Sequence, residues 1–335
     1  MKNLYKTMFL MLTLTGTTIT ISSQSWMMMW VGLEINLLSI IPLLTNVKNK
    51  MESEAAMKYF ITQALASTIF LFSIISMMES SWFMNKTQSS MVMDCAILTK
   101  MGAAPFHFWF PEVMEGLSWT SSTLMLTWQK IAPMVIFLHL PKSMMFIVMI
   151  IISSMMISGL MGINQTSMRK ILAYSSINHI GWMIAAMTSN QSTWIVYMLI
   201  YTIMTLNITM MFKMNNSFSI QQMINTMNNK KKMKILFSMN FLSLGGLPPF
   251  VGFIPKWMII NEMINSSMFF MTITMIIMTL MTLFFYMRIT LTSIILTSSE
   301  TSKINPTNKN KFTLMFFNSV TLSLLALSST LLNLT

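Results

Sequence analysis

The chain has 335 residues, of which 54% are apolar and only 9% charged, and its mean hydropathy is +0.64. This composition is typical of an integral membrane protein and leaves no polar stretch long enough to build a soluble domain. The net charge of +12 comes from lysines scattered in short loops, which excludes the basic face of a nucleic-acid-binding protein. The single cysteine, Cys95, excludes a disulfide framework and an all-cysteine iron–sulfur cluster carried by this chain alone.

Apolar windows predict about eleven transmembrane helices, so the expected fold class is an all-α polytopic membrane protein. The first apolar run follows two lysines but no small-residue cleavage site comes after it, so we interpret it as a transmembrane helix rather than a signal peptide. The predicted spans are 4–22, 25–45, 57–78, 90–110, 118–139, 144–162, 169–188, 193–213, 234–265, 268–296 and 312–333.

The basic residues are distributed unequally between the two sides of this predicted bundle. With eleven alternating spans, 15 of the 21 lysines and arginines lie on the side of the N-terminus and two on the opposite side. Because basic residues accumulate in cytoplasmic or matrix loops, the N-terminus is expected on the matrix or cytoplasmic side. An odd number of spans places the C-terminus on the other side.

The predicted spans 90–110 and 234–265 are both interrupted by glycine and proline, which break a helix within the membrane. The two interruptions match at one offset, in Gly102/Gly246, Pro105/Pro249, Phe106/Phe250 and Pro111/Pro255. They lie on the fourth and ninth spans, and a shift of five spans reverses the direction of crossing. We therefore expect one membrane domain, made of a five-helix repeat (1–142), an inverted repeat (143–298) and an additional C-terminal helix (299–335).

Four charged residues fall inside the predicted spans, away from their ends. Lys100 precedes the first interruption and Lys256 follows the second, while Lys130 and Glu34 lie in the middle of the fifth and second spans. A charge at this depth costs roughly 2.5–3.5 kcal/mol on insertion scales and usually marks an ion or proton path. Burial disfavours the charged form, so these groups can exchange protons near neutral pH. They are candidates for a row of proton carriers.

Other titratable residues have weaker signals. His179, in the seventh span, and His107, in the first interruption, are candidate relay groups, although a buried structural histidine is the alternative for each. Arg288 is expected to be structural, at a membrane interface, and Asp94 to be a capping or rim group. The sequence contains no phosphate-binding loop, dinucleotide fingerprint or Cys-x-x-Cys pair, and nothing in it indicates a metal site.

Five segments, in order along the chain, resemble the chain 2 family of mitochondrial NADH–ubiquinone oxidoreductase, respiratory complex I. They are Gly32-Leu-Glu-Ile-Asn-Leu-Leu38, Thr99-Lys-Met-Gly-Ala-Ala-Pro-Phe-His-Phe-Trp-Phe-Pro-Glu-Val113, Trp128-Gln-Lys-Ile-Ala-Pro133, Arg169-Lys-Ile-Leu-Ala-Tyr-Ser-Ser-Ile-Asn-His-Ile-Gly-Trp182 and Gly245-Gly-Leu-Pro-Pro-Phe-Val-Gly-Phe-Ile-Pro-Lys-Trp257.

The resemblance implies an antiporter-like subunit of the proton-pumping membrane arm, located in the mitochondrial inner membrane with its N-terminus in the matrix and its C-terminus in the intermembrane space. It implies no redox centre on this chain, since NADH, FMN, iron–sulfur clusters and ubiquinone belong to other subunits. The implied partners are other membrane-arm subunits, especially the antiporter-like chain 4 and the small chain 4L, together with the lipid bilayer.

By the same resemblance, Glu34 is a modulating acid paired with Lys100, Lys130 a central relay and Lys256 the terminal group towards an exit path. Two alternatives have the same sequence features. One is a self-contained cation/proton antiporter. The other is a structural subunit that bridges pumping neighbours and holds its charges in fixed ion pairs.

Overall fold

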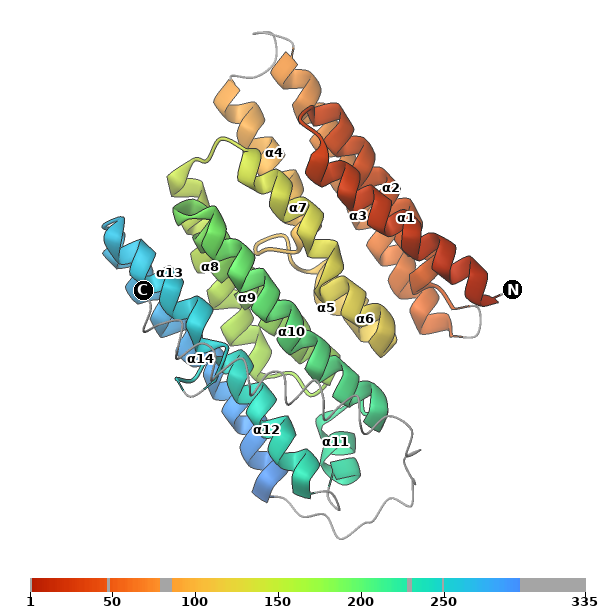
Figure 1. Cartoon of the computed structure of the whole chain (residues 1–335), viewed down its shortest axis with the longest axis vertical. Coiled ribbons are helices and arrows are strands. Elements are labelled where there is room, and N and C mark those ends of the chain that lie inside the picture. The colour runs from red at the N-terminus through yellow and green to blue at the C-terminus, as the bar shows by residue number, and fades with distance from the viewer. Residues whose placement is uncertain (1, 47–48, 79–85, 228–230, 249, 296–335) are drawn as a thin grey trace. The chain divides into compact units, whose positions relative to one another are not determined.

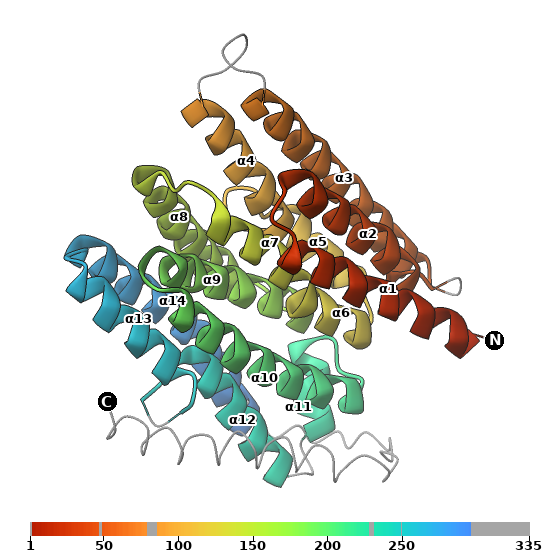
Figure 2. The same cartoon turned by 45° about the horizontal axis from the view of Figure 1, so that its top comes forward.

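The computed structural model describes residues 2–46, 49–78, 86–227, 231–248 and 250–295. Fourteen helices lie within these residues, and Figures 1 and 2 show how their ribbons run. The β-structure found in the same residues is an isolated bridge between Ser167 and Ser219. Five of the described helices are long and apolar enough to cross a membrane, namely α2, α3, α8, α10 and α14. The expected all-helical membrane fold is confirmed in this coarse form.

The chain divides into two compact units, Met1–Ile150 and Ile151–Thr335. The helices of the first unit are α1 (Lys2–Ser22), α2 (Trp26–Leu44), α3 (Lys50–Met78), α4 (Lys86–Met101), α5 (Trp109–Gly116), α6 (Trp119–Leu126) and α7 (Trp128–His139); α8 (Met144–Ile163) continues into the second. Glycines bring α1 and α2 together, because a Cβ atom on Gly32 would lie 2.5 Å from Thr20 Cγ2 and one on Gly16 would lie 2.9 Å from the backbone nitrogen of Asn36.

The helices of the second unit are α9 (Met168–Ser189), α10 (Gln191–Asn215), α11 (Ile220–Met227), α12 (Lys231–Gly245), α13 (Phe253–Asn265) and α14 (Phe269–Ile295). Every residue of α9 from Ile171 to Met187 is buried, so this helix is the core of its unit. It contacts α10, α13 and α14. A helix buried on all sides among apolar neighbours can carry polar side chains only where they find internal partners.

Both predicted interruptions are present. The first separates α4, which ends at Met101, from α5, which begins at Trp109; the second separates α12 from α13. Gly102 and Gly246, each just past the end of a helix, share a backbone φ of +76°. Glycine adopts this left-handed conformation without the steric cost that a Cβ atom brings, which explains why both interruptions begin with glycine. Pro249 lies outside the described residues.

Three features differ from the expected spans. The predicted span 118–139 is two helices, α6 and α7, divided at Thr127 (φ −113°, ψ −71°). Pro133 lies inside α7, where it has no N–H to bond the carbonyl of Gln129. The polar segment 213–234 contains the short helix α11, and α3 begins at Lys50, seven residues before the predicted start. The predicted span 312–333 lies outside the described residues.

Candidate functional site

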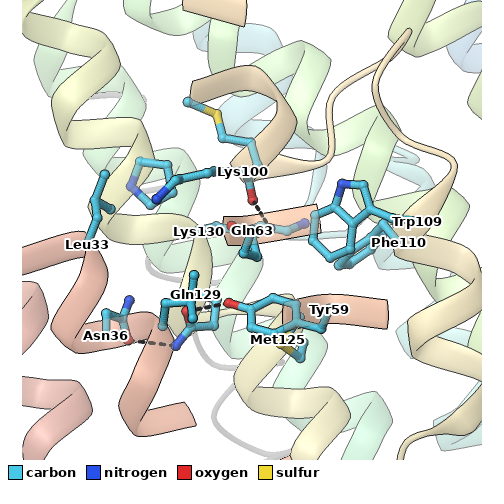
Figure 3. Close-up of a pocket in the computed structure, with 13 residues that line it drawn as sticks. Leu33, Asn36, Tyr59, Gln63, Lys100, Trp109, Phe110, Met125, Gln129 and Lys130 are labelled. Carbon is cyan, nitrogen blue, oxygen red and sulfur yellow. Dashed lines mark hydrogen bonds between the residues drawn. The ribbon is translucent and has the colours of Figure 1, made fainter. Parts of the chain in front are cut away.

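The first unit encloses a small cavity of about 20 Å³, room for at least one water molecule (Figure 3). Six helices, α2 to α7, contribute its walls. The lining residues are Leu33, Asn36, Leu37, Tyr59, Gln63, Lys100, Met101, Trp109, Phe110, Met125, Gln129, Lys130 and Pro133. The structure therefore brings two of the predicted lysines, Lys100 and Lys130, to one cavity, although they are 30 positions apart in the sequence.

Lys130 reaches the cavity from α7, three residues after the division between α6 and α7. Its side chain is buried, with 2% of the residue exposed. The Nζ atom lies 5.4 Å from the ring centroid of Phe110, on α5, and this cation–π contact offsets part of the cost of burying a charge.

Lys100 occupies the last turn of α4 and is also buried. The free carbonyl groups at a helix C-terminus carry partial negative charge, which favours a cation at this position. Glu34, on α2, is close enough to attract the Lys100 ammonium group electrostatically. No ion pair within 4 Å joins these two side chains, whereas Lys58 forms ion pairs of 3.1 Å with Glu54 and with Glu112. The carboxylate can therefore attract the Lys100 ammonium group without holding it in a fixed ion pair.

A network of neutral polar side chains connects the walls of the cavity, and sequence reasoning did not single it out. The Gln129 side chain donates from Nε2 to Asn36 Oδ1 (3.0 Å) and accepts from the Tyr59 hydroxyl at Oε1 (3.3 Å), as Figure 3 shows. Gln63 Nε2 donates to the backbone carbonyl of Lys100 (3.4 Å). Asn36 and Gln129 lie within two residues of Glu34 and Lys130, so proximity to a buried charge was the available signal.

In the second unit, Lys256 is bound across the interruption between α12 and α13. Its Nζ donates a hydrogen bond to the carbonyl oxygen of Gly245 (2.8 Å), at the C-terminal end of α12, and lies 5.9 Å from the ring centroid of Trp182 on α9. A Cβ atom on Gly246 would lie only 2.8 Å from this Nζ. Gly246 thus makes the turn and also leaves space for the lysine.

The two histidines have different surroundings. His179 is fully buried in α9, with Nδ1 2.8 Å from the Tyr197 hydroxyl on α10 and its ring centroid 5.0 Å from that of Tyr201. His107 is buried in the interruption between α4 and α5, with Nδ1 3.3 Å from the carbonyl oxygen of Pro105. His107 is not among the residues that line the cavity.

Two other expectations can be compared with the structure. Asp94 was expected to be a capping or rim group, but it lies in the middle of α4 and is buried, with 1% of the residue exposed. Arg288 is exposed and donates from Nη1 to the carbonyl oxygen of Ile163 at the end of α8 (3.0 Å), as a structural residue does. No group of three potential metal ligands is found within the described residues.

Comparison with known proteins identifies the family. A family model described as NADH:quinone oxidoreductase/Mrp antiporter, transmembrane, matches residues 23–282. The chain is 45% identical to NADH-ubiquinone oxidoreductase chain 2 of Locusta migratoria (92% of this chain, 91% of that one) and 42% identical to the Anopheles gambiae protein of that name (98% of each). The Mus musculus protein of the same name is 40% identical, over 98% of this chain and 95% of its own length.

Solved structures share the fold. A chain of respiratory complex I from Thermus thermophilus with bound aureothin superposes with a TM-score of 0.86 at 21% identity, over 97% of this chain and 78% of its own length. A chain of the Mrp complex from Dietzia sp. gives 0.75 at 16% identity, over 89% and 62%. Given this fold and these sequence identities over nearly the whole length, the chain belongs to the NADH-ubiquinone oxidoreductase chain 2 family.

Proposed function

We propose that this chain moves protons from the matrix to the intermembrane space as an antiporter-like membrane-arm subunit of NADH:ubiquinone oxidoreductase, in the mitochondrial inner membrane. The observation that carries the proposal is the pair of buried lysines, Lys100 and Lys130, on one cavity with room for water. A buried lysine changes protonation state readily, and a water or hydroxyl between two such groups can pass a proton.

The chemistry follows from the charges that face the cavity. Two ammonium groups in one small cavity repel each other, so protonation of Lys130 favours release of the proton from Lys100, and the reverse. The Glu34 carboxylate attracts the Lys100 ammonium group, so its charge can bias which of the two lysines holds the proton. The polar side chains of Asn36 and Gln129 can orient a water molecule in the cavity.

Lys256 is the proposed terminal group of this path. Its hydrogen bond to the Gly245 carbonyl holds the ammonium form at the negative end of α12. Moving one unit charge against 100 mV costs about 2.3 kcal/mol, so the path needs gates, and the interrupted helices provide places where such gates can form. His179, hydrogen-bonded to Tyr197, is the better supported of the two proposed relay histidines, because His107 faces a backbone carbonyl.

The proposed architecture is two inverted five-helix repeats, 1–142 and 143–298, within about eleven transmembrane helices that end with 299–335. Support comes from the shared φ of +76° at Gly102 and Gly246, which occupy matching positions of the repeat. The excess of basic residues on one side supports an N-terminus in the matrix and a C-terminus in the intermembrane space.

The proposed partners are the neighbouring chain 4, the small chain 4L and the lipid bilayer. We place NADH, FMN, the iron–sulfur clusters and ubiquinone in other subunits, since a single cysteine cannot hold a cluster of the usual type. The fold is shared with a chain of a respiratory complex, which supports the proposal that this chain functions within a large assembly.

Substitution of Lys100 by methionine in the assembled complex tests the proposal. We expect proton pumping and coupled turnover per complex to fall, while the complex still assembles. Pumping equal to that of the wild type would overturn the role of Lys100.

A self-contained antiporter is the second candidate, favoured by the likeness to an Mrp complex chain. Two measurements separate the candidates: migration on a native gel together with NADH-oxidising activity, and ion exchange by the purified chain in liposomes. Exchange by the isolated chain would favour the antiporter. The third candidate is a bridging subunit with fixed ion pairs; charge-removing substitutions would then lower assembly but leave pumping per assembled complex intact.

A further inference from the structure

Glu262, in the last turn of α13, is the centre of a set of hydrogen bonds that the proposed proton path does not use. Its Oε2 accepts from the hydroxyls of Ser189 (2.8 Å) and Thr193 (3.0 Å), and its Oε1 accepts from Asn190 Nδ2 (3.3 Å). These three donors lie at the end of α9 and the start of α10. One carboxylate therefore joins α13 to the turn between two other helices.

The position of the acid is unfavourable for its own helix. A carboxylate near a helix C-terminus faces the negative end of the helix dipole, so Glu262 gains nothing from α13 itself. It gains instead from α10, whose N-terminus carries partial positive charge, and from three donors. Asn190 is the N-cap residue of α10, but its side chain accepts no capping hydrogen bond from that helix and instead donates from Nδ2 to Glu262. The acid is thus placed for a tertiary contact.

The same helix carries Lys256, six residues earlier. Lys256 lies near Trp182 on α9, and Glu262 binds Ser189 on α9. Six residues of α13 span about 9 Å and the seven residues from Trp182 to Ser189 span about 10.5 Å, so the two helices run in the same direction with one polar anchor near each end. Two anchors fix the direction of a short helix, whereas one leaves it free to pivot.

We propose that Glu262 is a positioning residue for Lys256. Its hydrogen bonds to Ser189, Asn190 and Thr193, here called the latch, hold the half-helix α13 against the α9–α10 turn and so keep the lysine at the Gly245 carbonyl. The inference rests on the proposed role of Lys256 in proton transfer. The latch is also reversible, because each hydroxyl has a second acceptor in reach. Ser189 Oγ lies 3.1 Å from the carbonyl oxygen of Ala186, and Thr193 Oγ1 lies 2.9 Å from that of Asn190. When α13 moves away, each hydroxyl keeps an acceptor within hydrogen-bond distance.

The test measures proton pumping and coupled turnover per assembled complex in membrane vesicles. Glu262→Ala is expected to lower both about tenfold, less than the roughly hundredfold that a 1 Å misplacement of a catalytic group can cause. Glu262→Gln, which keeps an oxygen acceptor for both hydroxyls, should restore most of the loss. Asn261→Ala, an exposed change on the same helix, is the matched control and should be silent.

A double-mutant cycle separates positioning from a merely structural role. Lys256→Arg keeps the charge but changes its geometry, and we expect Glu262→Ala to add little to the loss that this variant causes. Losses that multiply would show that Glu262 acts independently of Lys256 and would overturn the proposal. Full pumping by Glu262→Ala would overturn it as well.

Assembly defects and failure of the underlying function are distinguished by two further variants. If Glu262→Ala does not assemble, the pair Ser189→Ala and Thr193→Val removes the two hydroxyl donors and keeps the acid; the same tenfold loss supports the latch, and normal pumping refutes it. If Lys256→Met pumps normally, the proposed function of Lys256 fails, and any loss in Glu262→Ala then reflects another cause.

Discussion

Replacing Lys130 by methionine separates stability from transport, because the two are expected to change in opposite directions. The lysine is 2% exposed, and a charge at mid-membrane depth costs roughly 2.5–3.5 kcal/mol on insertion scales. Its contact with Phe110 returns about 0.5–2 kcal/mol. Methionine has a similar volume and no charge, so the substitution should be neutral or stabilise the folded chain by up to about 3 kcal/mol. Removal of a proton-transfer group should slow pumping about 100-fold or more.

The assay is proton uptake into sealed vesicles on addition of NADH, normalised to the amount of complex seen on a native gel. Lys58→Met is the matched control, since Lys58 is half exposed and its ion pairs with Glu54 and Glu112 are of the exposed kind that contributes little. We expect normal pumping from the control and almost none from Lys130→Met. If the Lys130 variant assembles and pumps normally, the lysine is structural and the cavity is not part of the proton path.

Two further predictions concern the interruption in the second unit and the loop before α8. Gly246→Ala places a Cβ atom 2.8 Å from Lys256 Nζ at a residue with φ of +76°, so it should destabilise the chain by about 1–2 kcal/mol and lower pumping. Gly245→Ala is the control and should be tolerated, because its Cβ would lie 3.5 Å from the nearest neighbouring atom. Equal effects of the two substitutions would contradict the conclusion that Gly246 leaves space for Lys256. Burial lowers the pKa of Lys142, between α7 and α8, and attraction by Asp94 raises it in part. Asp94→Asn should therefore lower that pKa further, and the pH midpoint for amine modification of Lys142, followed by peptide mass spectrometry, should move down. An unchanged or higher midpoint would contradict this attraction.

Much of the architecture could be predicted from the sequence because its causes are local. Helices follow from runs of apolar residues, and every predicted span up to residue 295 contains at least one described helix, although α11 and most of α5 lie outside these spans. The two interruptions follow from glycine and proline, whose backbone preferences act within a few residues. The division at Thr127 carried no comparable signal, since Pro133, six residues later, is tolerated inside α7.

The candidate site was predictable only in part, because the sequence shows which residues are charged but not which of them meet. Lys100, Lys130 and Lys256 stand out because a lysine in an apolar run must be buried, and the structure buries all three. Whether two buried groups meet depends on how helices pack, and the sequence contains no direct record of that. Lys100 and Lys130 line one cavity because α4 and α7 pack against each other in the folded chain.

The neutral partners of these charges were also decided by the tertiary structure. Tyr59 and Gln129 are 70 positions apart and form a hydrogen bond because α3 and α7 meet at the cavity. Glu262 joins α13 to the α9–α10 turn over a similar separation. Hydropathy and local backbone preference, both readable in the sequence, place the apolar helices and the two interruptions rich in glycine and proline. The packing of distant helices decided which polar groups meet, because a buried hydrogen bond needs two partners that only the folded chain brings together.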